Sequence, residues 1–414
     1  MQFIADFHIH SKYSRATSKD MDLENLDKWA KIKGIKVLGT GDFTHPLWLK
    51  ELKEKLEPAE EGLLKSKSQN ETRFILTAEI SCIYSKKGRV RKIHLIIFAP
   101  SFEIAEKINA HLGWIGNLKA DGRPILGLDA KELLKIVLNV SKDCLVVPGH
   151  IWTPWFSLFG SKSGFDSLEE CFEEYSKYIF AGETGLSSDP AMNWRLSALD
   201  KITLISNSDS HSPGKIGREA NVFDTELSYP AIIEAIKSKN PQKFLYTIEF
   251  FPQEGKYHYD GHRICGISLS PQASKKYGNI CPNCGKPLTI GVLNRVEELA
   301  DRPEGFKPAN AISFKSLIPL EEIIADALGV LSKTKQVEKE YKNLIEKLGN
   351  EFEVLLNSSR QDLEKITLPE ITEGIIRTRE GKVFIEPGYD GVYGKIRIFS
   401  PGEQKNINKQ GILF

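Results

Sequence analysis

Short apolar runs alternate with amphipathic stretches along the first 211 residues, and this alternation limits the fold more than any other feature of the chain. Amphipathic segments at 23–33, 102–112 and 130–140 separate several of the runs. The runs are Ile4–His10, Val37–Phe43, Phe74–Tyr84, Ile93–Pro100, Cys144–Ile151, Tyr178–Gly185 and Ile202–His211. Alternating strands and helices predict a parallel α/β architecture. Seven strands are too few for the eight-stranded barrel, so a seven-stranded barrel or an open doubly wound sheet fits.

The length of the chain predicts more than one domain. At 414 residues and about 150 residues per domain, two or three domains are expected. We place an α/β domain at 1–250, a polar, cysteine-containing module at 251–307 and an α+β region at 308–414. In the last region, 320–331 and 337–348 have helical periodicity, and 382–399 reads as a β-hairpin around Pro387-Gly388.

Composition excludes several classes of protein. The 56 basic and 55 acidic residues give a net charge of +1, so nucleic acid could be contacted only through local basic patches. One such patch is Lys86–Lys92, although a basic run is more often only a solvated face. No apolar stretch approaches the roughly 18 residues of a membrane span, and the N-terminus lacks the pattern of a secretory signal. Six cysteines are too few for a disulfide framework. We therefore expect a cytoplasmic protein that does not enter membranes.

The placement of the histidines predicts a metal site. Six of the nine lie near the ends of the predicted strands: His8, His10, His45, His94, His150 and His211. Carboxylates accompany them: Asp6, Asp42, Glu79, Glu183 and Asp209. In a strand, residues two apart share a face, so His8 and His10 project together, as do Asp209 and His211. A single His-X-His is about as often a simple surface pair, but so many ligands at one edge predict two or three divalent ions, Zn, Mn or Mg.

A second cluster predicts a structural zinc ion. Cys281 and Cys284 form a Cys-X-X-Cys knuckle, and His262 and Cys265 form a pair with the same two-residue gap. Fifteen residues separate the two pairs, a spacing compatible with one tetrahedral site. Three thiolates and one imidazole complete the coordination shell, so this ion would be structural. His258 is a rival fourth ligand.

The histidine pattern resembles the polymerase and histidinol phosphatase (PHP) superfamily over roughly residues 1–250. His8 and His10 match its opening His-X-His, Asp209 and His211 match its closing Asp-X-His, and Glu79 matches its bridging carboxylate. His94 and His150 match its middle ligands. The resemblance implies a distorted seven-stranded (β/α)7 barrel, a site for two or three metals, and hydrolysis of phosphoesters.

Two departures from the superfamily pattern leave residue roles open. Arg15 stands where many members carry an acid or a histidine; it either holds a substrate phosphate or pairs with an acid such as Asp20. Asp42 and His45 are separated by two residues where members have an adjacent pair, so either remains a candidate ligand. Asp189 follows the sixth predicted strand and is either a catalytic base or orienting group, or a simple turn residue.

Nearly the whole chain resembles the endonuclease Q family of DNA-repair enzymes. The resemblance is carried by Asp6–Ser14, Gly39–Asp42 with His45-Pro46, Gly185–Pro190, and the segment from Lys256 to Arg302. It implies a metal-dependent endonuclease that nicks DNA 5′ of deaminated bases (uracil, hypoxanthine and xanthine) and of abasic sites. DNA carrying these lesions is then the expected partner, and recruitment by a sliding clamp is left open.

Two other functions compete with the endonuclease. One is a phosphatase for small phosphomonoesters, in which the residues beyond 250 serve assembly. The other is a non-catalytic module that binds DNA or a replication partner, with Arg15 marking a decayed site. The otherwise complete ligand set argues against the second, and the match over Lys256–Arg302 argues against the first.

Overall fold

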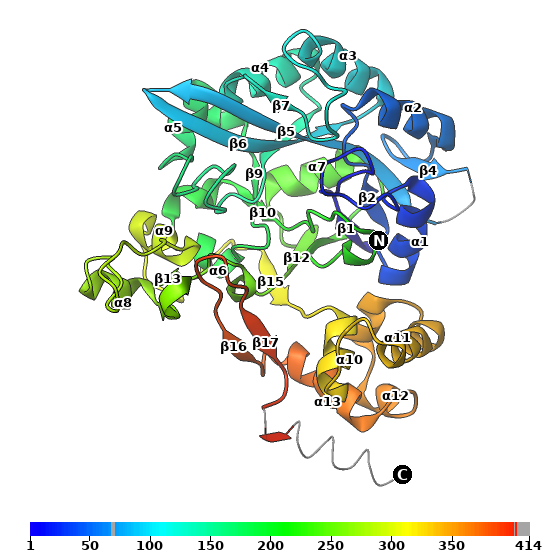
Figure 1. The fold of residues 1–414 in the computed structure, drawn as a ribbon. Helices are drawn as coiled ribbons and strands as arrows, with labels where there is room; N and C mark the ends of the chain where they lie inside the picture. The colour runs from blue at the N-terminus through cyan, green and yellow to red at the C-terminus, as the bar shows by residue number, and fades with distance from the viewer. Residues whose placement is uncertain (68–70, 401, 404–414) are drawn as a thin grey trace.

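A mixed 11-stranded sheet forms the centre of the protein (Figure 1). The structure is a computed structural model, and it describes residues 1–67, 71–400 and 402–403. Neighbouring strands follow the order β15-β12-β11-β1-β2-β5-β4-β3, while β6 pairs with β5 and β8, and β7 pairs with β5. The strands of this sheet are β1 (Gln2–Asp6), β2 (Val37–Gly39), β3 (Leu56–Pro58), β4 (Leu64–Ser66), β5 (Arg73–Lys86), β6 (Arg89–Ala99), β7 (Ile125–Leu126), β8 (Leu145–Pro148), β11 (Ala220–Asp224), β12 (Phe244–Glu249) and β15 (Ser313–Ser316).

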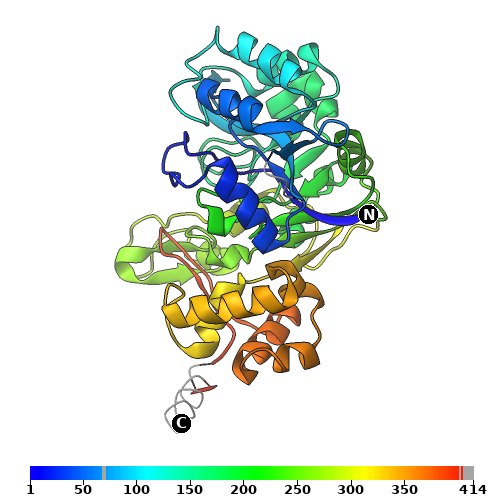
Figure 2. The ribbon, with the colours of Figure 1, turned by 90° about the vertical axis from the view of Figure 1, so that its right-hand side faces the viewer.

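Helices cover the sheet and build the C-terminal region (Figures 1 and 2). Those in the first 250 residues are α1 (Leu23–Lys33), α2 (Pro46–Lys55), α3 (Phe102–Leu112), α4 (Ala130–Val140), α5 (Leu168–Phe172), α6 (Pro190–Asn193) and α7 (Tyr229–Ser238). Those that follow are α8 (Pro271–Lys276), α9 (Val292–Leu299), α10 (Leu320–Leu328), α11 (Lys335–Leu348), α12 (Arg360–Glu364) and α13 (Pro369–Arg379). Single 3-10 turns occur at Glu173–Tyr178, Ser197–Lys201, Pro213–Lys215, Pro252–Glu254 and Arg263–Cys265, and a π turn occurs at Glu353–Asn357.

Helix boundaries follow the amphipathic pattern of the sequence. Asp22 caps α1 by accepting a hydrogen bond from the backbone N–H of Asn25, and Gly34 ends the helix with a φ of +89°. Ser101 and Asp129 cap α3 and α4 in the same way. These three helices begin and end at the residues that the sequence predicts.

The predicted α/β class is confirmed, but the strands are not all parallel as expected, because the sheet is mixed. All seven predicted strands overlap strands of the structure, including β9 (Ala181–Glu183) and β10 (Thr203–Ile205), which pair parallel with each other. However, β5 and β6 form a long antiparallel hairpin. The two-residue turn Lys87-Gly88, with both φ angles positive, joins them directly, so no crossover helix fits between.

The predicted seven-stranded ring is not closed by continuous ladders in the described residues. The β9-β10 pair forms a sheet of its own. It is connected to its neighbours by single links: the Ile151 N–H donates to the Glu183 carbonyl at 3.0 Å, and Ile9 bridges to Ser210. Because β9 and β10 have only three residues each, these single links do not extend into continuous ladders.

Aromatic packing fixes the centre of the sheet beneath the histidines. Phe7 is fully buried and lies edge-on to Phe98, with ring centroids 5.4 Å apart. Phe223 continues the stack toward Phe244 at 4.6 Å. Since Phe7 and Ile9 alternate with His8 and His10, burying the former in the core sets the direction of the two imidazoles.

Residues 251–307, called here the Cys/His module, lie at one side of the sheet (Figure 1). The module contains the short hairpin β13 (Asp260–His262) and β14 (Ile267–Leu269), with α8 and α9. The predicted C-terminal hairpin is present as β16 (Phe384–Glu386) and β17 (Lys395–Arg397). Its tip reaches the module, where the Tyr259 N–H donates to the Gly388 carbonyl at 2.9 Å.

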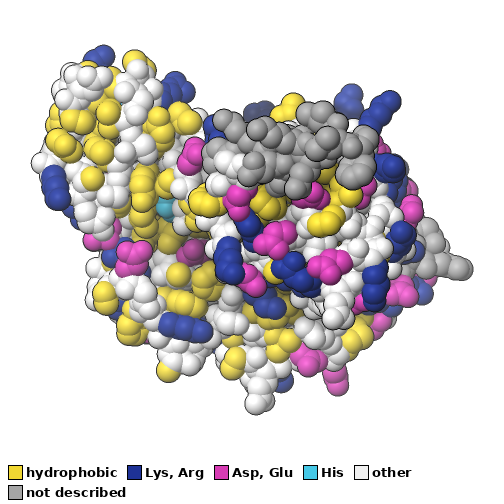
Figure 3. Space-filling model, turned by 90° about the horizontal axis from the view of Figure 1, so that it is seen from below, with side chains coloured by type: hydrophobic (Ala, Val, Ile, Leu, Met, Phe, Trp, Pro, Cys, Tyr) yellow, Lys and Arg dark blue, Asp and Glu magenta, His cyan; other side chains and the backbone are white. Residues whose placement is uncertain are grey.

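The C-terminal helices dock on the α/β domain through ion pairs, of which the one between Lys33 and Glu351 is buried. Lys33, at the end of α1, lies 2.6 Å from Glu351, and Lys215 contacts Glu321 and Glu322 on α10. Seen from below, the part of the molecule at left, the side on which Figure 1 shows α8 and α9, stands apart from the body, and apolar side chains and a histidine lie in the hollow between them (Figure 3). None of the described helices is long and apolar enough to cross a membrane.

Candidate metal centres

Two groups of buried side chains meet at Glu79. The ligand atoms of His8, His10, Glu79 and Asp209 all lie within 4.8 Å of one another, and so do those of Glu79, His94 and His150. His8 and His10 follow β1, and Asp209 follows β10. Glu79 and His94 lie on the β5-β6 hairpin, and His150 follows β8. The structure therefore brings together six of the residues that the sequence predicts for the metal site.

The carboxylates of Asp42 and Glu183 orient the first two histidines. Asp42 Oδ1 lies 3.1 Å from His10 Nδ1, and its other oxygen accepts hydrogen bonds from Ser11 and Ser14. Glu183 Oε1 lies 3.0 Å from His8 Nδ1. Each contact occupies Nδ1 and turns Nε2 toward Glu79, which lies 3.4 Å from His8 and 3.2 Å from His10. A carboxylate behind a histidine fixes its ring orientation and raises its basicity as a metal ligand.

Hydroxyl groups orient the other two histidines. His94 Nδ1 lies 2.6 Å from Glu79 Oε1, while its Nε2 contacts Ser81 Oγ at 3.1 Å. His150 Nε2 lies 3.2 Å from the same Glu79 oxygen, and its Nδ1 contacts Thr153 Oγ1 at 3.1 Å. All four imidazoles thus present one nitrogen to Glu79 and one to the surrounding protein.

The electrostatics of the cluster are those of a cation site. Burial lowers the pKa of His8 and His10, but facing carboxylates outweigh it and raise both values well above the ordinary one. Burial likewise opposes ionisation of Glu79, yet His94 and Arg123 hold its pKa well below normal. Burial lowers the pKa of His94 to about 4. The buried Nε2 of His8 has no hydrogen-bond partner. An imidazole nitrogen facing carboxylates without a partner fits a divalent ion that takes nitrogen and oxygen ligands.

Three site residues have positive backbone φ angles. These angles are +49° at Asp42, +29° at His150 and +46° at Asp209. Aspartate and histidine adopt this region more often than most other non-glycine residues, aspartate because its short side chain can bond locally. Each residue lies two to four positions after the end of a strand, so the backbone turn beyond the strand aims the side chain into the cluster.

Several predicted site residues lie outside the two ligand groups. His45 begins α2 and stacks on Tyr13 with ring centroids 4.5 Å apart, so Asp42 is the member of that motif that contacts the cluster. His211 is partly exposed; its Nδ1 lies 2.9 Å from the Asp209 carbonyl and its ring packs against that of His10. Asp189 accepts from the Met192 N–H as the N-cap of α6, and its hydrogen bonds in the described chain do not reach the cluster.

Arg123, and not Arg15, is the arginine that reaches the metal site. Arg15 is exposed and pairs with Asp121 at 3.3 Å, not with Asp20 or Asp22. Arg123 Nη1 lies 3.2 Å from Glu79 Oε2, at the metal site itself. Sequence reasoning missed it because the loop at 121–124 carries no motif. The loop reaches the site because Gly122 packs on Asp42 and Ser14, with no room for a Cβ atom.

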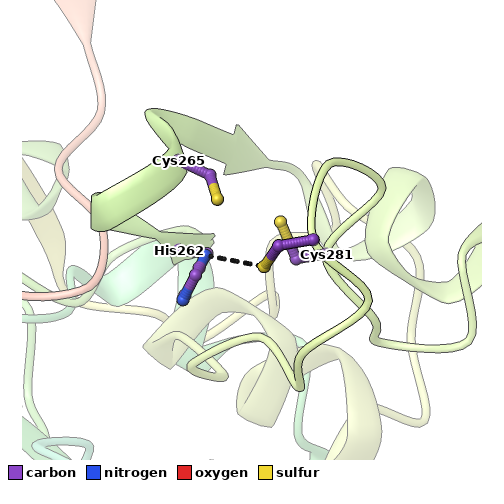
Figure 4. Close-up of side chains that lie close together, drawn as sticks. His262, Cys265 and Cys281 are labelled. Atoms are coloured by element: carbon purple, nitrogen blue, oxygen red, sulfur yellow. Dashed lines mark hydrogen bonds between the residues drawn. The ribbon is translucent and has the colours of Figure 1, made fainter.

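The predicted cysteine cluster also forms (Figure 4). The ligand atoms of His262, Cys265, Cys281 and Cys284 lie within 4.8 Å of one another, and Cys284 Sγ is 3.5 Å from His262 Nδ1. Gly285, with a φ of +73°, lets the knuckle turn back so that its N–H donates to the Cys281 carbonyl. Although burial acts in the opposite direction, the N–H groups of Cys284 and Asn283 lower the pKa of the Cys281 thiol to about 7. Three sulfurs and one imidazole nitrogen are a donor set suited to zinc.

His258, the rival fourth ligand, is not part of this cluster. It is buried and stacks on Tyr259 with ring centroids 5.5 Å apart. Burial lowers the pKa of His258 to about 4. The pairing of His262 with Cys265 is therefore the one that the fold supports.

Sequence comparisons match the C-terminal region and the whole chain. A family model described as the MJ0043 C-terminal domain matches residues 319–382. The protein MJ0043 of Methanocaldococcus jannaschii is 37% identical over 259 residues, which is 60% of this chain but only 31% of that protein. The protein YqxK of Bacillus subtilis is 29% identical over 413 residues, covering 95% of this chain and 98% of its own.

Two solved structures match the entire fold. The lesion-specific endonuclease PfuEndoQ of Pyrococcus furiosus is 31% identical, with a TM-score of 0.86, over 98% of this chain and 99% of its own. A complex of endonuclease Q with a 27-mer duplex carrying an abasic lesion at the active site is 32% identical, with a TM-score of 0.84 and 97% coverage of both chains. At this identity, over essentially full length, the chain belongs to the endonuclease Q family.

Proposed function

We propose that this protein is a metal-dependent DNA endonuclease that hydrolyses the phosphodiester bond 5′ of deaminated bases and abasic sites. The observation that carries the proposal is the pair of buried ligand groups joined at Glu79, inside a chain similar to endonuclease Q along its whole length. The DNA bound to one relative has an abasic lesion at its active site. The resemblance of the sequence to this family adds three deaminated bases to the substrate class: uracil, hypoxanthine and xanthine.

We assign two ions to the site, one bound by His8, His10 and Asp209 and one by His94 and His150, with Glu79 shared. Zn, Mn or Mg ions bound there would supply Lewis-acid activation of water and neutralise charge that develops on the phosphate. Asp42 and Glu183 hold His10 and His8 in the orientation that ligation requires. A third ion would need His211 or His45, which lie outside the two groups.

Arg123 is the cation that we assign to the substrate phosphate. Its guanidinium reaches Glu79 at 3.2 Å. A planar guanidinium matches the oxygens of a phosphate in a way that an ammonium does not. Arg15 is exposed and held by Asp121, so its assignment is to the rim of the site. Asp189 is assigned to capping α6.

The remaining parts of the chain serve the same reaction in this proposal. Residues 1–250 form the catalytic domain, in which β1, β2, β5, β6, β8, β9 and β10 correspond to the PHP barrel. Residues 251–307 form a module held by one structural zinc ion, and residues 308–414 form a third region, of which 401 and 404–414 lie outside the described residues. Since the substrate is genomic DNA, we assign the protein to the cytoplasm.

A nicking assay tests the function directly. Labelled duplexes with one uracil, one hypoxanthine or one abasic site are incubated with Mg, Mn or Zn. We expect a single nick 5′ of the lesion, and we expect His8→Ala and Asp209→Ala to abolish it because each removes a ligand. His111→Ala is the matched control, because His111 is an exposed histidine on α3.

The alternatives give different results in the same assay. Intact DNA under every metal, together with rapid cleavage of a chromogenic phosphomonoester, would replace the endonuclease with a phosphatase. Intact DNA together with intact phosphomonoester would leave a binding module.

A further inference from the structure

A cationic pocket lies on the flank of the protein, between the tip of the β5-β6 hairpin, the loop after His150, and α9 of the Cys/His module. The labels β6, α5 and α9 mark this side in Figure 1. Its basic lining residues are Lys87, Arg89, Arg91, Lys162 and Arg295. Its acidic ones are Asp166, Glu170 and Glu298. Nothing in the proposed metal chemistry uses these residues.

The hairpin tip holds two of the cations at its exposed end. Lys87 and Gly88 form the turn, with φ angles of +52° and +72°, and Lys86 pairs with Arg89 across the ladder. Lys87 and Arg89 are exposed, and neither makes an ion pair within the described part of the chain. The turn therefore holds two side-chain charges that are free to meet a ligand.

The opposite wall is the compact loop Gly160–Gly164. The Gly164 N–H donates to the Gly160 carbonyl at 2.8 Å, and the Lys162 N–H donates to the Pro154 carbonyl at 3.0 Å. Neither glycine has room for a Cβ atom, because backbone atoms of the same loop pack against both. Lys162 sits on this loop with its side chain exposed, and it has no ion-pair partner among the described residues.

Arg91 forms the base of the pocket. Its side chain is buried and stacks on Phe165, with the guanidinium carbon 4.1 Å from the ring centroid, while Nη1 donates to the Gly164 carbonyl. Its Nε has no hydrogen-bond partner. A buried charged donor without a partner is costly unless a ligand satisfies it.

In the described residues, the acidic residues of the pocket make no ion pair with Lys87, Arg89, Arg91 or Lys162. Arg295 pairs with Asp166 and, at 2.8 Å, with Glu298. Glu170 accepts from the Asp166 N–H at 3.2 Å. Lys87, Arg89, Arg91 and Lys162 remain as the charge that an incoming anion would meet.

One loop connects this pocket to the metal site. It starts at His150, whose Nδ1 contacts Thr153, and its Phe156 carbonyl accepts the N–H of His94 at 3.1 Å. Further along, Ser163 accepts the N–H of Lys92 through its carbonyl at 3.3 Å. The loop therefore runs beside β6 from the metal site to the pocket.

We propose that this pocket binds the phosphates of the DNA backbone beside the scissile bond, with Arg89 and Lys162 as the two mobile contacts and Arg91 as the fixed donor. The proposal rests on the proposed function in one respect, namely that the bound polymer is DNA. Phosphate oxygens, not bases, are recognised, so the contact positions DNA without reading its sequence.

Salt dependence of binding tests the proposal. Binding of a lesion duplex is followed by fluorescence anisotropy in the His8→Ala background, with Arg89→Ala/Lys162→Ala added. Each lost phosphate contact should reduce the slope of log K against log salt by about 0.9, so two contacts reduce it by about 1.8. The ratio of the binding constant without the double substitution to that with it should then shrink about tenfold between about 50 and 200 mM salt. Lys339→Ala/Lys347→Ala, on exposed α11 positions, is the matched control.

Two further measurements distinguish the phosphates of DNA from free phosphate as the ligand of the pocket. Neutral methylphosphonates placed one at a time along the strand should weaken wild-type binding at the contacted positions and leave the double variant unaffected there. Inorganic phosphate at millimolar concentration should not displace the duplex; displacement would assign the pocket to a free anion and overturn the proposal.

An unchanged slope in the double variant would also overturn the proposal. Because anisotropy measures binding without cleavage, a changed slope with no nicking in the wild type would uphold the pocket and reject the endonuclease. A loss of nicking in the double variant at saturating DNA would point instead to distortion of the metal site, and would reject the pocket as a simple binding element.

Discussion

The two candidate metal centres are built in opposite ways. The Cys/His site draws its ligands from one short stretch: Cys284 and His262 are 22 positions apart, and Cys284 is exposed. The site at Glu79 draws its ligands from the ends of distant strands: His10 and Asp209 are 199 positions apart, and most of the cluster is buried. At a local site, the ion itself contributes much of the order of the loops that ligate it. A non-local site is formed by the fold, and the ions bind to a scaffold that already exists.

Loss of the Cys/His ion should have the largest effect. Cys281→Ser removes one thiolate, and structural zinc sites contribute about 10–16 kcal/mol to the order of their domain. We expect the zinc content to fall by one ion per chain and the Cys/His module to become sensitive to protease, measured by mass spectrometry of the metal and by limited proteolysis. Cys144→Ala, at a buried cysteine elsewhere, should change neither. An unchanged zinc content in Cys281→Ser would show that this cluster does not hold a structural zinc ion.

Loss of the shared carboxylate should abolish activity and leave the fold intact. Glu79→Gln should lower kcat by about a thousandfold, or about 4 kcal/mol, because both ion positions lose a charged ligand. The melting temperature and the Cys/His zinc should be retained, as measured by calorimetry and metal analysis. Glu226→Gln, on an exposed loop, serves as the control. Loss of both kinds of metal in Glu79→Gln would show that the two centres are not independent.

Loss of an orienting carboxylate should have an intermediate effect. Asp42→Asn and Glu183→Gln keep the shape of the side chain and remove the charge behind His10 and His8, so we expect metal affinity or activity to fall about 10–100-fold. Steady-state kinetics over a metal titration measures this. Asp189→Asn is the matched control: asparagine caps a helix as well as aspartate does, so activity should persist. A large loss in Asp189→Asn would instead identify a catalytic base.

The smallest expected effect is a difference in the pH at which the centres release their ions. Carboxylates raise the pKa of His8 and His10 well above the ordinary value, so protons compete for these nitrogens as the pH falls through that raised range. The Cys281 thiol, with a pKa of about 7, ionises more readily than an ordinary thiol. On dialysis from high to low pH, the ions at Glu79 should therefore leave first. Metal content at each pH measures the order of release, and the reverse order would contradict the proposed difference between the two centres.

How far the sequence predicted each centre depends on how local the centre is. Spacing alone predicted the three cysteine ligands and left His262 and His258 as candidates for the fourth, because two pairs with the same gap are typical of tight turns. The residues at Glu79 were recognisable only through their positions after predicted strands and the family pattern. The orienting role of Asp42 and the position of Arg123 were not predictable, because both depend on which loops pack against each other.

The same division holds for the fold. By itself, the sequence determined the helices α1, α3 and α4 to the residue, the approximate positions of seven strands and the Cys-X-X-Cys knuckle, because caps, periodicity and ligand spacing act over a few residues. Only the tertiary structure decided that β9 and β10 pair in a sheet of their own, that Asp42 and Glu183 stand behind His10 and His8, and that the loop after His150 links this site to a cationic pocket. Those features come from contacts between segments tens to hundreds of residues apart, and the free energy that selects them is that of packing the whole core.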